Sequence, residues 1–476
     1  MSAFLAASAI RAAVAGSWLR SPSDDVVPDG VTIDSRGEIL GKLFVAIRGE
    51  RFDGNDFAGE AARQGAAIVM VDRDVPHVPA SAGVLYVPDA RRALGQLASA
   101  WREQLTRVRV VAITGSAGKT TTRRLVDGVL GAVWKGSASP KSFNNDIGVP
   151  LTLLAARRDD EYLVVEIGMN HPGEIHSLAS IARPNLAIIT MVGRAHLAGL
   201  GSVEAIAREK TSLLDALPGA GGGGIAIVNG DQPLMTAAIE ARRLRLDRLI
   251  RFGVSPSADL RLTCRRTTGG SQEIEIDGAA QFTLNLPGEH NAMNALAAIV
   301  VGRELGLPDE AIRRGLASVE PSGMRLERID VPVQGGTVTL YNDAYNANPD
   351  AMAASIRAFA ELSPTAKRRV LVLGDMLELG DASADLHREV GTVAAQVSTT
   401  TPIHAAIAVG SFAEYTREGL ATAGWRGDAL VLSSFDDAQV ARAVAFLRAG
   451  DVALVKGSRG ARMERLVTAI ANPVPR

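Results

Sequence analysis

The residues with the clearest chemical pattern are Thr-Gly-Ser-Ala-Gly-Lys-Thr-Thr at positions 114–121, which follow an apolar run. Glycines in such a turn let backbone N–H groups close around phosphate oxygens, and the helix that follows adds partial positive charge. Lys119 supplies a full charge, and the hydroxyl of Thr120 can bind Mg²⁺. The general phosphate-binding loop has a glycine five residues before Gly118, where this chain has Ile113, so this loop is a shortened variant. The pattern predicts nucleotide binding without identifying the reaction.

Two polar side chains follow apolar runs further along the same region. Glu166 lies near the end of the run 162–167, and His196 follows the run 186–191. The carboxyl ends of parallel strands meet at one sheet edge, where ligands bind in open α/β folds. Glu166 is therefore a candidate Mg²⁺ ligand, with a structural ion pair as the alternative. His196 taken alone is more typical of a surface or hydrogen-bonded histidine.

Lys210 stands inside an apolar helical stripe. The stripe consists of Val203, Ile206, Ala207, Leu213, Leu214 and Leu217. Burial disfavours the charged form of a lysine, so we expect a lowered pKa for Lys210. A neutral amine can react with CO₂ to give a carbamate, an anion able to bind a second Mg²⁺. The stripe by itself favours the alternative, a lysine whose amine reaches the helix edge.

The elements that must position these residues indicate an α/β fold with three domains. We expect an N-terminal mixed α/β domain at 1–105, a central parallel-sheet domain with the phosphate loop at 106–322, and a Rossmann-like α/β domain at 323–476 that begins with a hairpin. The third domain lacks G-x-G-x-x-G, so no dinucleotide site is assigned to it. The predicted strands are 43–47, 67–71, 108–114, 162–167, 186–191, 225–228, 369–373, 405–409, 429–432 and 452–455.

The composition argues against several other classes of protein. The 476 residues are 47% hydrophobic and 22% charged with a formal net charge of −1, as in a globular protein that does not bind nucleic acid through bulk charge. The single cysteine, Cys264, forms no intrachain disulfide. Arg11 interrupts the apolar start, and the longest uncharged stretch, 390–413, contains many polar residues. We therefore expect a cytoplasmic protein without membrane insertion.

Several motifs, in order along nearly the whole chain, resemble the Mur ligase family and, within it, the MurF type. The Tyr-Asn-Ala-Asn-Pro and Gly-Asp-Met-Leu-Glu-Leu-Gly segments at 345–349 and 374–380 favour that type, and the chain has no Asn-Pro-Arg tripeptide of the diaminopimelate-adding relatives. The motifs lie at 34–36 with 41–46, 114–120, 144–150, 166–175, 195–202, 287–294, 342–349 and 373–380.

The resemblance implies roles for individual residues. For the nucleotide, it implies phosphate contacts from Lys119 and Arg325, adenine contacts from Asn291 and Asn294, and ribose contacts from Asp343. The full set implied for ATP is Gly115, Ser116, Ala117, Gly118, Lys119, Thr120, Thr121, Asn291, Asn294, Arg325 and Asp343. The catalytic set is Lys119, His196, Lys210 and Arg325. Thr120 and Glu166 would hold one Mg²⁺, and His196 with carbamylated Lys210 a second.

The remaining implied contacts are to substrates. For a UDP-sugar they are Asp34, Ser35, Arg36 and Lys42. The other implied substrate contacts are Asn144, Asn145, His171 and Tyr345, with Asn346 and Asn348 near the dipeptide or the nucleotide. For His171, a role as base for the attacking amine and a substrate-positioning role both remain open. The chain departs from the family pattern at Asn55, where histidine is frequent, and at Ser116-Ala117, where Thr-Asn is usual. The first departure is expected to affect substrate contacts of the N-terminal domain, whereas the second concerns backbone contacts and should matter little.

The implied activity is an ATP-dependent ligation of D-alanyl-D-alanine to UDP-N-acetylmuramoyl-tripeptide through an acyl phosphate, by a monomer. The third peptide residue is left open between meso-diaminopimelate and lysine. Alternatives are another Mur ligase, a folylpolyglutamate synthase, or a small-molecule kinase or nucleotide-gated binding protein. The synthases usually carry the phosphate loop closer to the N-terminus than position 114.

Overall fold

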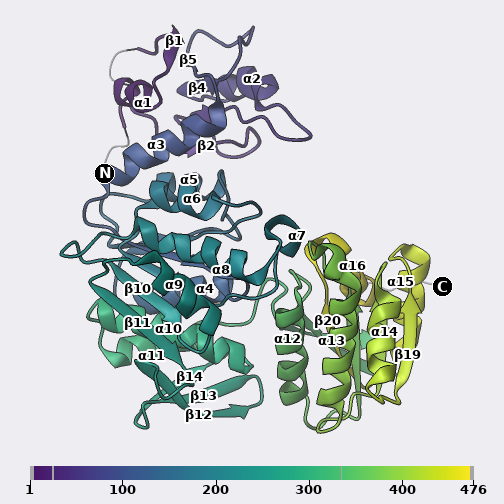
Figure 1. The fold of residues 1–476 in the computed structure, drawn as a ribbon. Helices are drawn as coiled ribbons and strands as arrows, with labels where there is room; N and C mark the ends of the chain where they lie inside the picture. The colour runs from purple at the N-terminus through teal and green to yellow at the C-terminus, as the bar shows by residue number, and fades with distance from the viewer. Residues whose placement is uncertain (1–4, 24–25, 334, 472–476) are drawn as a thin grey trace.

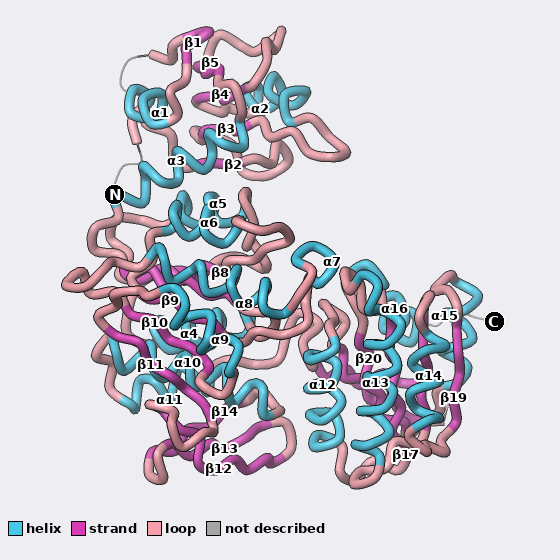
Figure 2. The backbone as a smooth tube through the Cα atoms, in the orientation of Figure 1, coloured by secondary structure: helices cyan, strands magenta, loops and turns pink. Residues whose placement is uncertain are grey.

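The computed structural model describes residues 5–23, 26–333 and 335–471, which form three β-sheets in consecutive stretches of the chain (Figure 1). We call these stretches the N-terminal, central and C-terminal units. In each unit the strands lie among helices and loops (Figure 2). None of the helices in the described part of the chain is long and apolar enough to cross a membrane.

The N-terminal unit has the strand order β1-β5-β4-β3-β2, in which β1 alone runs antiparallel to its neighbour. The predicted strands 43–47 and 67–71 correspond to β3 and β4. Its elements are α1 (Ala7–Ala13), β1 (Ser17–Arg20), β2 (Val31–Thr32), β3 (Leu43–Val45), η1 (Gly54–Phe57), α2 (Ala58–Arg63), β4 (Ile68–Val71), β5 (Gly83–Tyr86) and α3 (Ala90–Gln104).

The central unit has the strand order β14-β13-β12-β11-β10-β9-β6-β8-β7, with parallel pairing from β7 to β12. Its strands are β6 (Arg109–Thr114), β7 (Gly136–Ala138), β8 (Tyr162–Glu166), β9 (Leu186–Ile189), β10 (Ile225–Asn229), β11 (Arg248–Gly253), β12 (Leu260–Thr268), β13 (Ser271–Ile276) and β14 (Ala280–Leu284). Its helices are α4 (Lys119–Gly131), α5 (Gly148–Ala155), α6 (Glu174–Ala182), α7 (Leu197–Leu200), α8 (Val203–Thr211), η2 (Ser212–Ala216), α9 (Pro233–Arg242), α10 (Glu289–Glu304) and α11 (Asp309–Ala317).

One edge of the central sheet differs from the expected all-parallel arrangement. Strands β12, β13 and β14 pair antiparallel as two consecutive hairpins. The first hairpin turns at Gly269-Gly270, where Gly269 has φ 62°, and the second turns at Asp277-Gly278, where both residues have positive φ. Glycine and aspartate pairs of this kind favour tight hairpin turns. The sequence therefore carried a signal for this edge that the search for buried parallel strands missed.

The C-terminal unit has the strand order β15-β16-β20-β17-β18-β19, and only the edge strand β15 is antiparallel. The opening hairpin and the four predicted strands of this unit are present. Its elements are β15 (Glu327–Val333), β16 (Gly336–Asn342), α12 (Pro349–Leu362), β17 (Arg368–Gly374), η3 (Gly380–Ala382), α13 (Ser383–Ser398), β18 (Ala405–Val409), α14 (Ala413–Thr422), β19 (Asp428–Leu432), α15 (Asp437–Phe446), β20 (Asp451–Lys456), η4 (Arg459–Ala461) and α16 (Glu464–Ala471).

Helices cover both faces of the central sheet. Val110 and Ala112 of β6 belong to one buried apolar cluster, and Val111 and Ile113 belong to another, because successive strand residues point to opposite faces. The first cluster continues into the N-terminal unit through Trp101 and other α3 residues. The C-terminal unit has separate clusters of its own. Apolar packing thus joins the first two units, whereas the C-terminal unit contacts the central one largely through polar side chains.

The domain boundaries after residues 105 and 322 stay predictions. The first falls directly after α3, and the second falls between α11 and β15. Both positions lie in connections between elements, but the shared apolar cluster means that the first boundary does not separate two independent cores.

Candidate active site

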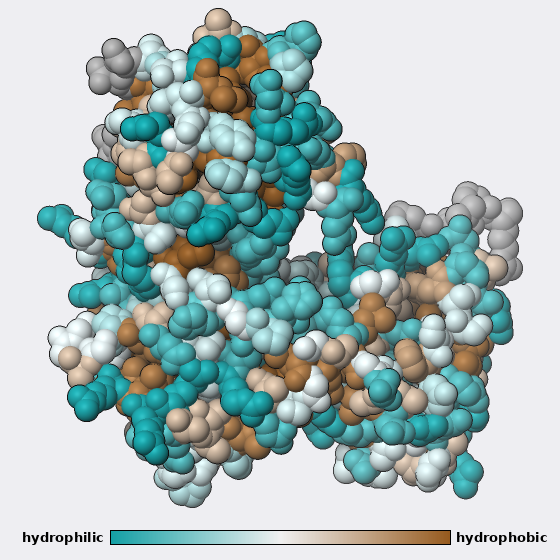
Figure 3. All heavy atoms as spheres, turned by 45° about the horizontal axis from the view of Figure 1, so that its top comes forward, coloured by the Kyte–Doolittle hydropathy of each residue, from teal (hydrophilic) through white to brown (hydrophobic). Residues whose placement is uncertain are grey.

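The units meet around a cavity of about 1250 Å³. The N-terminal unit contributes Glu50 and Arg91, and the other two units contribute the remaining lining residues. In the space-filling view the surface is hollowed between the N-terminal and C-terminal units, and hydrophilic residues dominate its surroundings (Figure 3). A candidate residue that contacts the nucleotide should therefore line this cavity.

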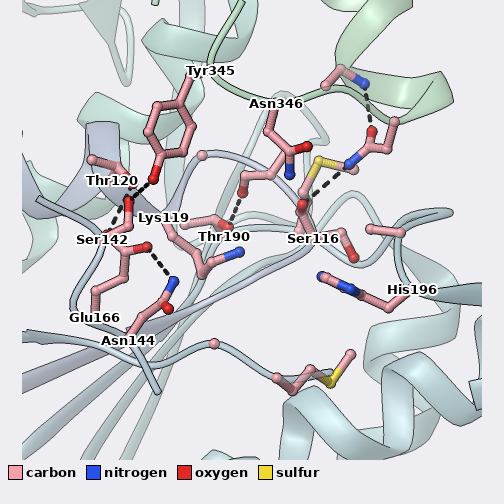
Figure 4. Close-up of a pocket in the computed structure, with 18 of the residues that line it drawn as sticks. Ser116, Lys119, Thr120, Ser142, Asn144, Glu166, Thr190, His196, Tyr345 and Asn346 are labelled. Carbon is pink, nitrogen blue, oxygen red and sulfur yellow. Dashed lines mark hydrogen bonds between the residues drawn. The ribbon is translucent and has the colours of Figure 1, made fainter. Parts of the chain in front are cut away.

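The phosphate loop lies between the end of β6 and the start of α4. Gly118 has φ 84°, in the left-handed region that glycine tolerates. A Cβ atom on Gly115 would overlap Thr190 Oγ1, and one on Gly118 would overlap Asn294 Oδ1. Thr190 Oγ1 donates to Ala117 O at 2.5 Å and so fastens the loop to the end of β9 (Figure 4). Close packing around the loop requires both glycines.

Lys119 lies at the first position of α4 with its amine inside the cavity. Its Nζ donates to Gly115 O at 2.7 Å. Desolvation lowers the pKa of Lys119, the charge of Arg325 lowers it further, and Glu166 opposes the shift. The amine of Lys119 and the ring of His196 point toward the same part of the cavity (Figure 4). A phosphate there would meet a cation that bonds only to a loop carbonyl, and would restore its charged form.

Thr120, Glu166 and Asn144 form a connected set at the sheet edge, as Figure 4 shows. Thr120 Oγ1 donates to Glu166 Oε2 at 2.9 Å, and Asn144 Nδ2 donates to Glu166 Oε1 at 2.9 Å. Glu166 is 1% exposed. Within the described residues, no three His, Cys, Asp or Glu side chains gather closely enough to hold a metal ion. A carboxylate with one hydroxyl suits Mg²⁺, which takes its other ligands from phosphate and water.

Arg325 crosses from the C-terminal unit to the phosphate loop. Its Nη2 donates to Thr120 Oγ1 at 3.0 Å, and its guanidinium lies 4.3 Å from the centre of the Tyr345 ring. Tyr345 in turn donates its hydroxyl to Ser142 Oγ. A cation and an aromatic ring from one unit are thereby fixed against the nucleotide-binding loop of another. Ser142 was not predicted from the sequence.

His196 and Lys210 occupy different environments. His196 has φ 60°, and its Nδ1 lies 2.6 Å from Glu378 Oε2 of the C-terminal unit. His196 lines the cavity, whereas Lys210 is 1% exposed and lies outside the lining. Desolvation, then the charge of Lys119, moves the pKa of Lys210 well below its ordinary value. The Lys210 amine does not reach solvent at a helix edge.

Asn291 and Asn294 of α10 are joined by a side-chain hydrogen bond. Asn291 Nδ2 donates to Pro287 O at 2.7 Å, and Asn294 Nδ2 donates to Asn291 Oδ1 at 3.2 Å. Thr122 Oγ1 donates to Asn294 Oδ1, which connects α10 to α4. Both asparagines line the cavity although each is more than nine-tenths buried. Their amides are fixed in orientation, as a base-recognition site requires.

Asp343 is held from several directions. Its Oδ2 accepts from Lys456 Nζ at 2.6 Å and from Ser355 Oγ at 2.5 Å, and its Oδ1 accepts from the backbone of Leu326. Lys456 also donates to the carbonyl of Asn346 at 3.1 Å. Lys456 and Ser355 were not predicted from the sequence. They follow Asp343 by 113 and 12 positions, and no local pattern indicates that they contact it.

The other predicted contacts divide into two groups. Asn144, Asn145, His171, Tyr345, Asn346 and Asn348 line the cavity together with the phosphate loop. Asn348 Nδ2 donates to Ser116 O at 3.2 Å, while its Oδ1 caps α12. Asn145 Oδ1 accepts from the first backbone amides of α5. His171 is exposed.

Asp34, Ser35, Arg36 and Lys42 are not among the residues that line the cavity. Asp34 and Arg36 form an exposed ion pair at 2.9 Å, and the Arg36 hydrogen bonds lower the pKa of Asp34 to about 2. Asn55 is fully buried and donates to Asp53 and Asp72. These contacts give Asn55 a structural role within the N-terminal unit, and its effect on substrate contacts stays a prediction.

Charged pairs connect the C-terminal unit to the central unit at two places. Arg194 donates to Asp350 at 2.9 Å and to both oxygens of Glu389 at 2.6 and 2.9 Å. Arg265, on the unexpected β12 hairpin, donates to both oxygens of Glu361 at 2.7 Å. Two-point arginine–carboxylate contacts fix orientation as well as distance. The relative position of the two units thus depends on a few polar contacts.

A phosphate loop at the carboxyl edge of a parallel sheet, completed by an arginine from a second α/β unit, defines a nucleotide-dependent enzyme assembled from several units. The chain belongs to the Mur ligase family. The Mur ligase family catalytic domain matches residues 28–102, the Mur ligase middle domain matches 113–302, and the Mur ligase glutamate ligase domain matches 324–459.

Two curated relatives that align over nearly the whole chain are ligases with the same name. The UDP-N-acetylmuramoyl-tripeptide–D-alanyl-D-alanine ligase of Bacillus subtilis is 35% identical over 95% of both chains, and that of Escherichia coli is 36% identical over 94% of both. A crystal structure of MurF from Acinetobacter baumannii aligns with TM-score 0.83 and 30% identity over 98% of this chain and 99% of that one. MurF of Thermotoga maritima in complex with ADP aligns with TM-score 0.76 and 27% identity over 93% and 97%.

Proposed function

We propose that this chain joins D-alanyl-D-alanine to UDP-N-acetylmuramoyl-tripeptide with hydrolysis of ATP to ADP and phosphate. The observation that carries the proposal is the contact of Arg325 with Thr120, which places a C-terminal-unit cation at the phosphate loop. A ligase of this type needs such an arrangement, because the loop supplies the nucleotide and the other units supply the two joined substrates. The relatives at 94–95% coverage support the choice of substrates.

The terminal carboxylate of the tripeptide is a poor acyl donor and must first be activated. The carboxylate of the tripeptide attacks the γ-phosphorus of ATP, the bond to the β–γ bridging oxygen breaks, and an acyl phosphate and ADP form. The amine of D-alanyl-D-alanine then attacks the acyl carbon, loses a proton, and expels inorganic phosphate to leave an amide. The protein's share is to position the groups and to neutralise charge on the transferring phosphoryl group.

Lys119 and Arg325 are the side chains proposed for that neutralisation. Both line the cavity next to the loop, and neither forms an ion pair of 4 Å or less among the described residues, so both charges are available to phosphate oxygens. Asn291 and Asn294 would hold the adenine, and Asp343, oriented by Lys456, would accept from the ribose hydroxyls. Asn144, Asn145, His171, Tyr345, Asn346 and Asn348 are proposed to contact the joined substrates.

Mg²⁺ is proposed as the cofactor, with Thr120 and Glu166 holding one ion beside the ATP phosphates. Bound there, it would withdraw charge from the phosphoryl oxygens. The second site is proposed to use His196 and the carbamate of Lys210. The buried Lys210 amine suits this role because burial favours its neutral form, which is the form that reacts with CO₂.

The N-terminal unit is proposed to hold the UDP end of the precursor through Asp34, Ser35, Arg36 and Lys42, outside the cavity. Each proposed nucleotide and metal contact comes from a single chain, so a monomer is sufficient for the reaction. ATP and a UDP-linked precursor are cytoplasmic metabolites, which places the proposed reaction in the cytoplasm.

The test is phosphate release from Mg-ATP by the purified chain. Release is expected only when the UDP-linked tripeptide and D-alanyl-D-alanine are both present, together with a product whose mass equals the two joined substrates less one water. A small-molecule kinase would need no second amine. Phosphorylated product without an amide bond, or no product at all, would refute the proposal.

Because an acyl phosphate is lost to water, catalysis should depend on the charged pairs that close the C-terminal unit on the central one. Reversing one charge, in Arg265→Glu or Glu361→Arg, is expected to lower kcat about three- to tenfold, since a contact between like charges replaces an attractive one. The double reversal should recover most of the loss. Arg266→Glu, one residue along β12, is the matched control. Steady-state rates of phosphate release measure all four variants, and unchanged kcat in both single variants would contradict this role.

A further inference from the structure

Arginines gather beside the phosphate loop beyond what the nucleotide requires. Arg123 and Arg124 lie on α4, and Arg325 reaches the same place from the C-terminal unit. Among the ion pairs of the described residues, only that of Arg123 with Glu166 involves any of the three, with Nε and Oε2 3.9 Å apart. Three like charges that share a single carboxylate partner are a cost to folding that a bound anion would offset.

Arg123 is the most unusual member of the group. It is 8% exposed, and its Nε has no hydrogen-bond partner in the described part of the chain. Desolvation lowers the pKa of its guanidinium, Arg325 lowers it further, and Glu166 and Asp127 act in the opposite direction. A buried guanidinium N–H without a hydrogen-bond partner is rare in native proteins. Arg123 therefore adds buried positive charge next to Arg124, with Glu166 as its ion-pair partner among the described residues.

Arg124 adds positive charge at the cavity surface. It lines the cavity, and its Nη2 donates to the carbonyl oxygen of Glu320 at 2.5 Å. That contact leaves the other guanidinium donors of Arg124 without a hydrogen-bond partner in the described residues, while desolvation and then Arg123 and Arg325 lower its pKa. The neighbouring Ser142 and Tyr345 also line the cavity and add hydroxyl groups.

Position along α4 separates Arg124 from the nucleotide phosphates. Those phosphates belong at the helix N-terminus, where Lys119 stands. Arg124 comes five residues later, which is about 7.5 Å further along the axis at 1.5 Å per residue. Arg124 also contacts the segment that leads directly to Arg325. It is therefore placed to bind an anion next to the phosphoryl group rather than the phosphoryl group itself.

We propose that Arg124, supported by Arg123, binds a second carboxylate of the peptide substrate, next to the carboxylate that is phosphorylated. The chain would then prefer a tripeptide whose third residue carries a side-chain carboxylate, as meso-diaminopimelate does, over one that ends in lysine. The inference rests on the proposed function and decides between the two substrates that the sequence leaves open. Planar guanidinium groups suit carboxylates because they donate two parallel hydrogen bonds.

The test compares kcat/KM for the two UDP-linked tripeptides, with D-alanyl-D-alanine and Mg-ATP saturating. The unaltered chain is expected to favour the diaminopimelate substrate at least about tenfold, which corresponds to one charge-assisted hydrogen bond. Arg124→Ala should remove most of that preference by raising KM for the diaminopimelate substrate, while KM for ATP and for the lysine substrate stays within about twofold. Arg124→Lys should keep part of the preference.

Arg107→Ala, at an exposed arginine in the turn before β6, is the matched control and should leave the preference unchanged. Equal kcat/KM for both tripeptides in the unaltered chain would overturn the inference, as would a preference that Arg124→Ala retains. A loss of ATP affinity in Arg124→Ala would also overturn it by assigning the arginine to the nucleotide. Amide formation with either tripeptide keeps the proposed function intact in each of these cases, whereas activity with neither refutes the function itself.

Discussion

Replacing Lys119 by methionine is expected to lower kcat/KM by at least about a thousandfold. The substitution keeps the aliphatic length but removes the cation at the start of α4, whose amine donates to the carbonyl of Gly115. Loss of one preorganised charge at a transferring phosphoryl group costs about 10²–10³-fold, and loss of nucleotide affinity adds to this. Phosphate release with both substrates present measures the effect, and Lys367→Met, at an exposed lysine, is the control.

Although Lys119→Met should lose activity, it is not expected to lose stability. Burial lowers the pKa of Lys119, so the unfolded chain binds more protons than the folded chain at pH values between this lowered pKa and the ordinary lysine pKa. The free energy of unfolding of the nucleotide-free protein therefore rises with pH as this lysine loses its proton, and Lys119→Met should remove that part of the pH dependence. Thermal unfolding of Lys119→Met at neutral pH should occur at an equal or higher temperature. A large loss of stability would mean that the kinetic defect reports misfolding.

The phosphate loop could be predicted from the sequence because its parts are contiguous. A buried strand, two glycines, a lysine and a helix start all lie within residues 109–131, and each is a local feature. The position of Glu166 near Thr120 could also be predicted, because parallel strands end at one edge of a sheet. The α/β architecture and the family are confirmed, whereas the roles of the individual residues stay predictions.

Contacts between distant segments could not be predicted in this way. Arg265 and Glu361 lie 96 residues apart, and Arg194 and Glu389 lie 195 apart. In the sequence each is an ordinary charged residue, and only the packing of two units selects its partner. Asn55 is a related case, because its motif position gave no sign of the hydrogen bonds that its buried side chain makes to Asp53 and Asp72.

Lys210 is the residue whose chemistry depends most on its surroundings. It is 1% exposed, and burial together with the charge of Lys119 favours its neutral amine. CO₂ converts a neutral amine to a carbamate anion with release of a proton, and that anion would attract the nearby Lys119 instead of repelling it. An amine without this modification would remain a potential second cation next to Lys119. The proposed carbamate would therefore remove this repulsion and supply oxygen atoms for Mg²⁺ at the same time.

Lys210→Ala is accordingly expected to lose activity about a hundredfold or more and to regain part of it when short carboxylic acids such as acetate or propionate are added. Such an acid fits the space left by the side chain and returns a carboxylate to the carbamate position. Lys119→Met should show no rescue, because its missing group is a cation. Phosphate release titrated against each acid measures the effect, and chloride at equal ionic strength is the control. If neither acid restores activity and the unaltered protein binds no ¹³C-labelled CO₂ at this lysine, the carbamate is ruled out and Lys210 acts as a buried amine.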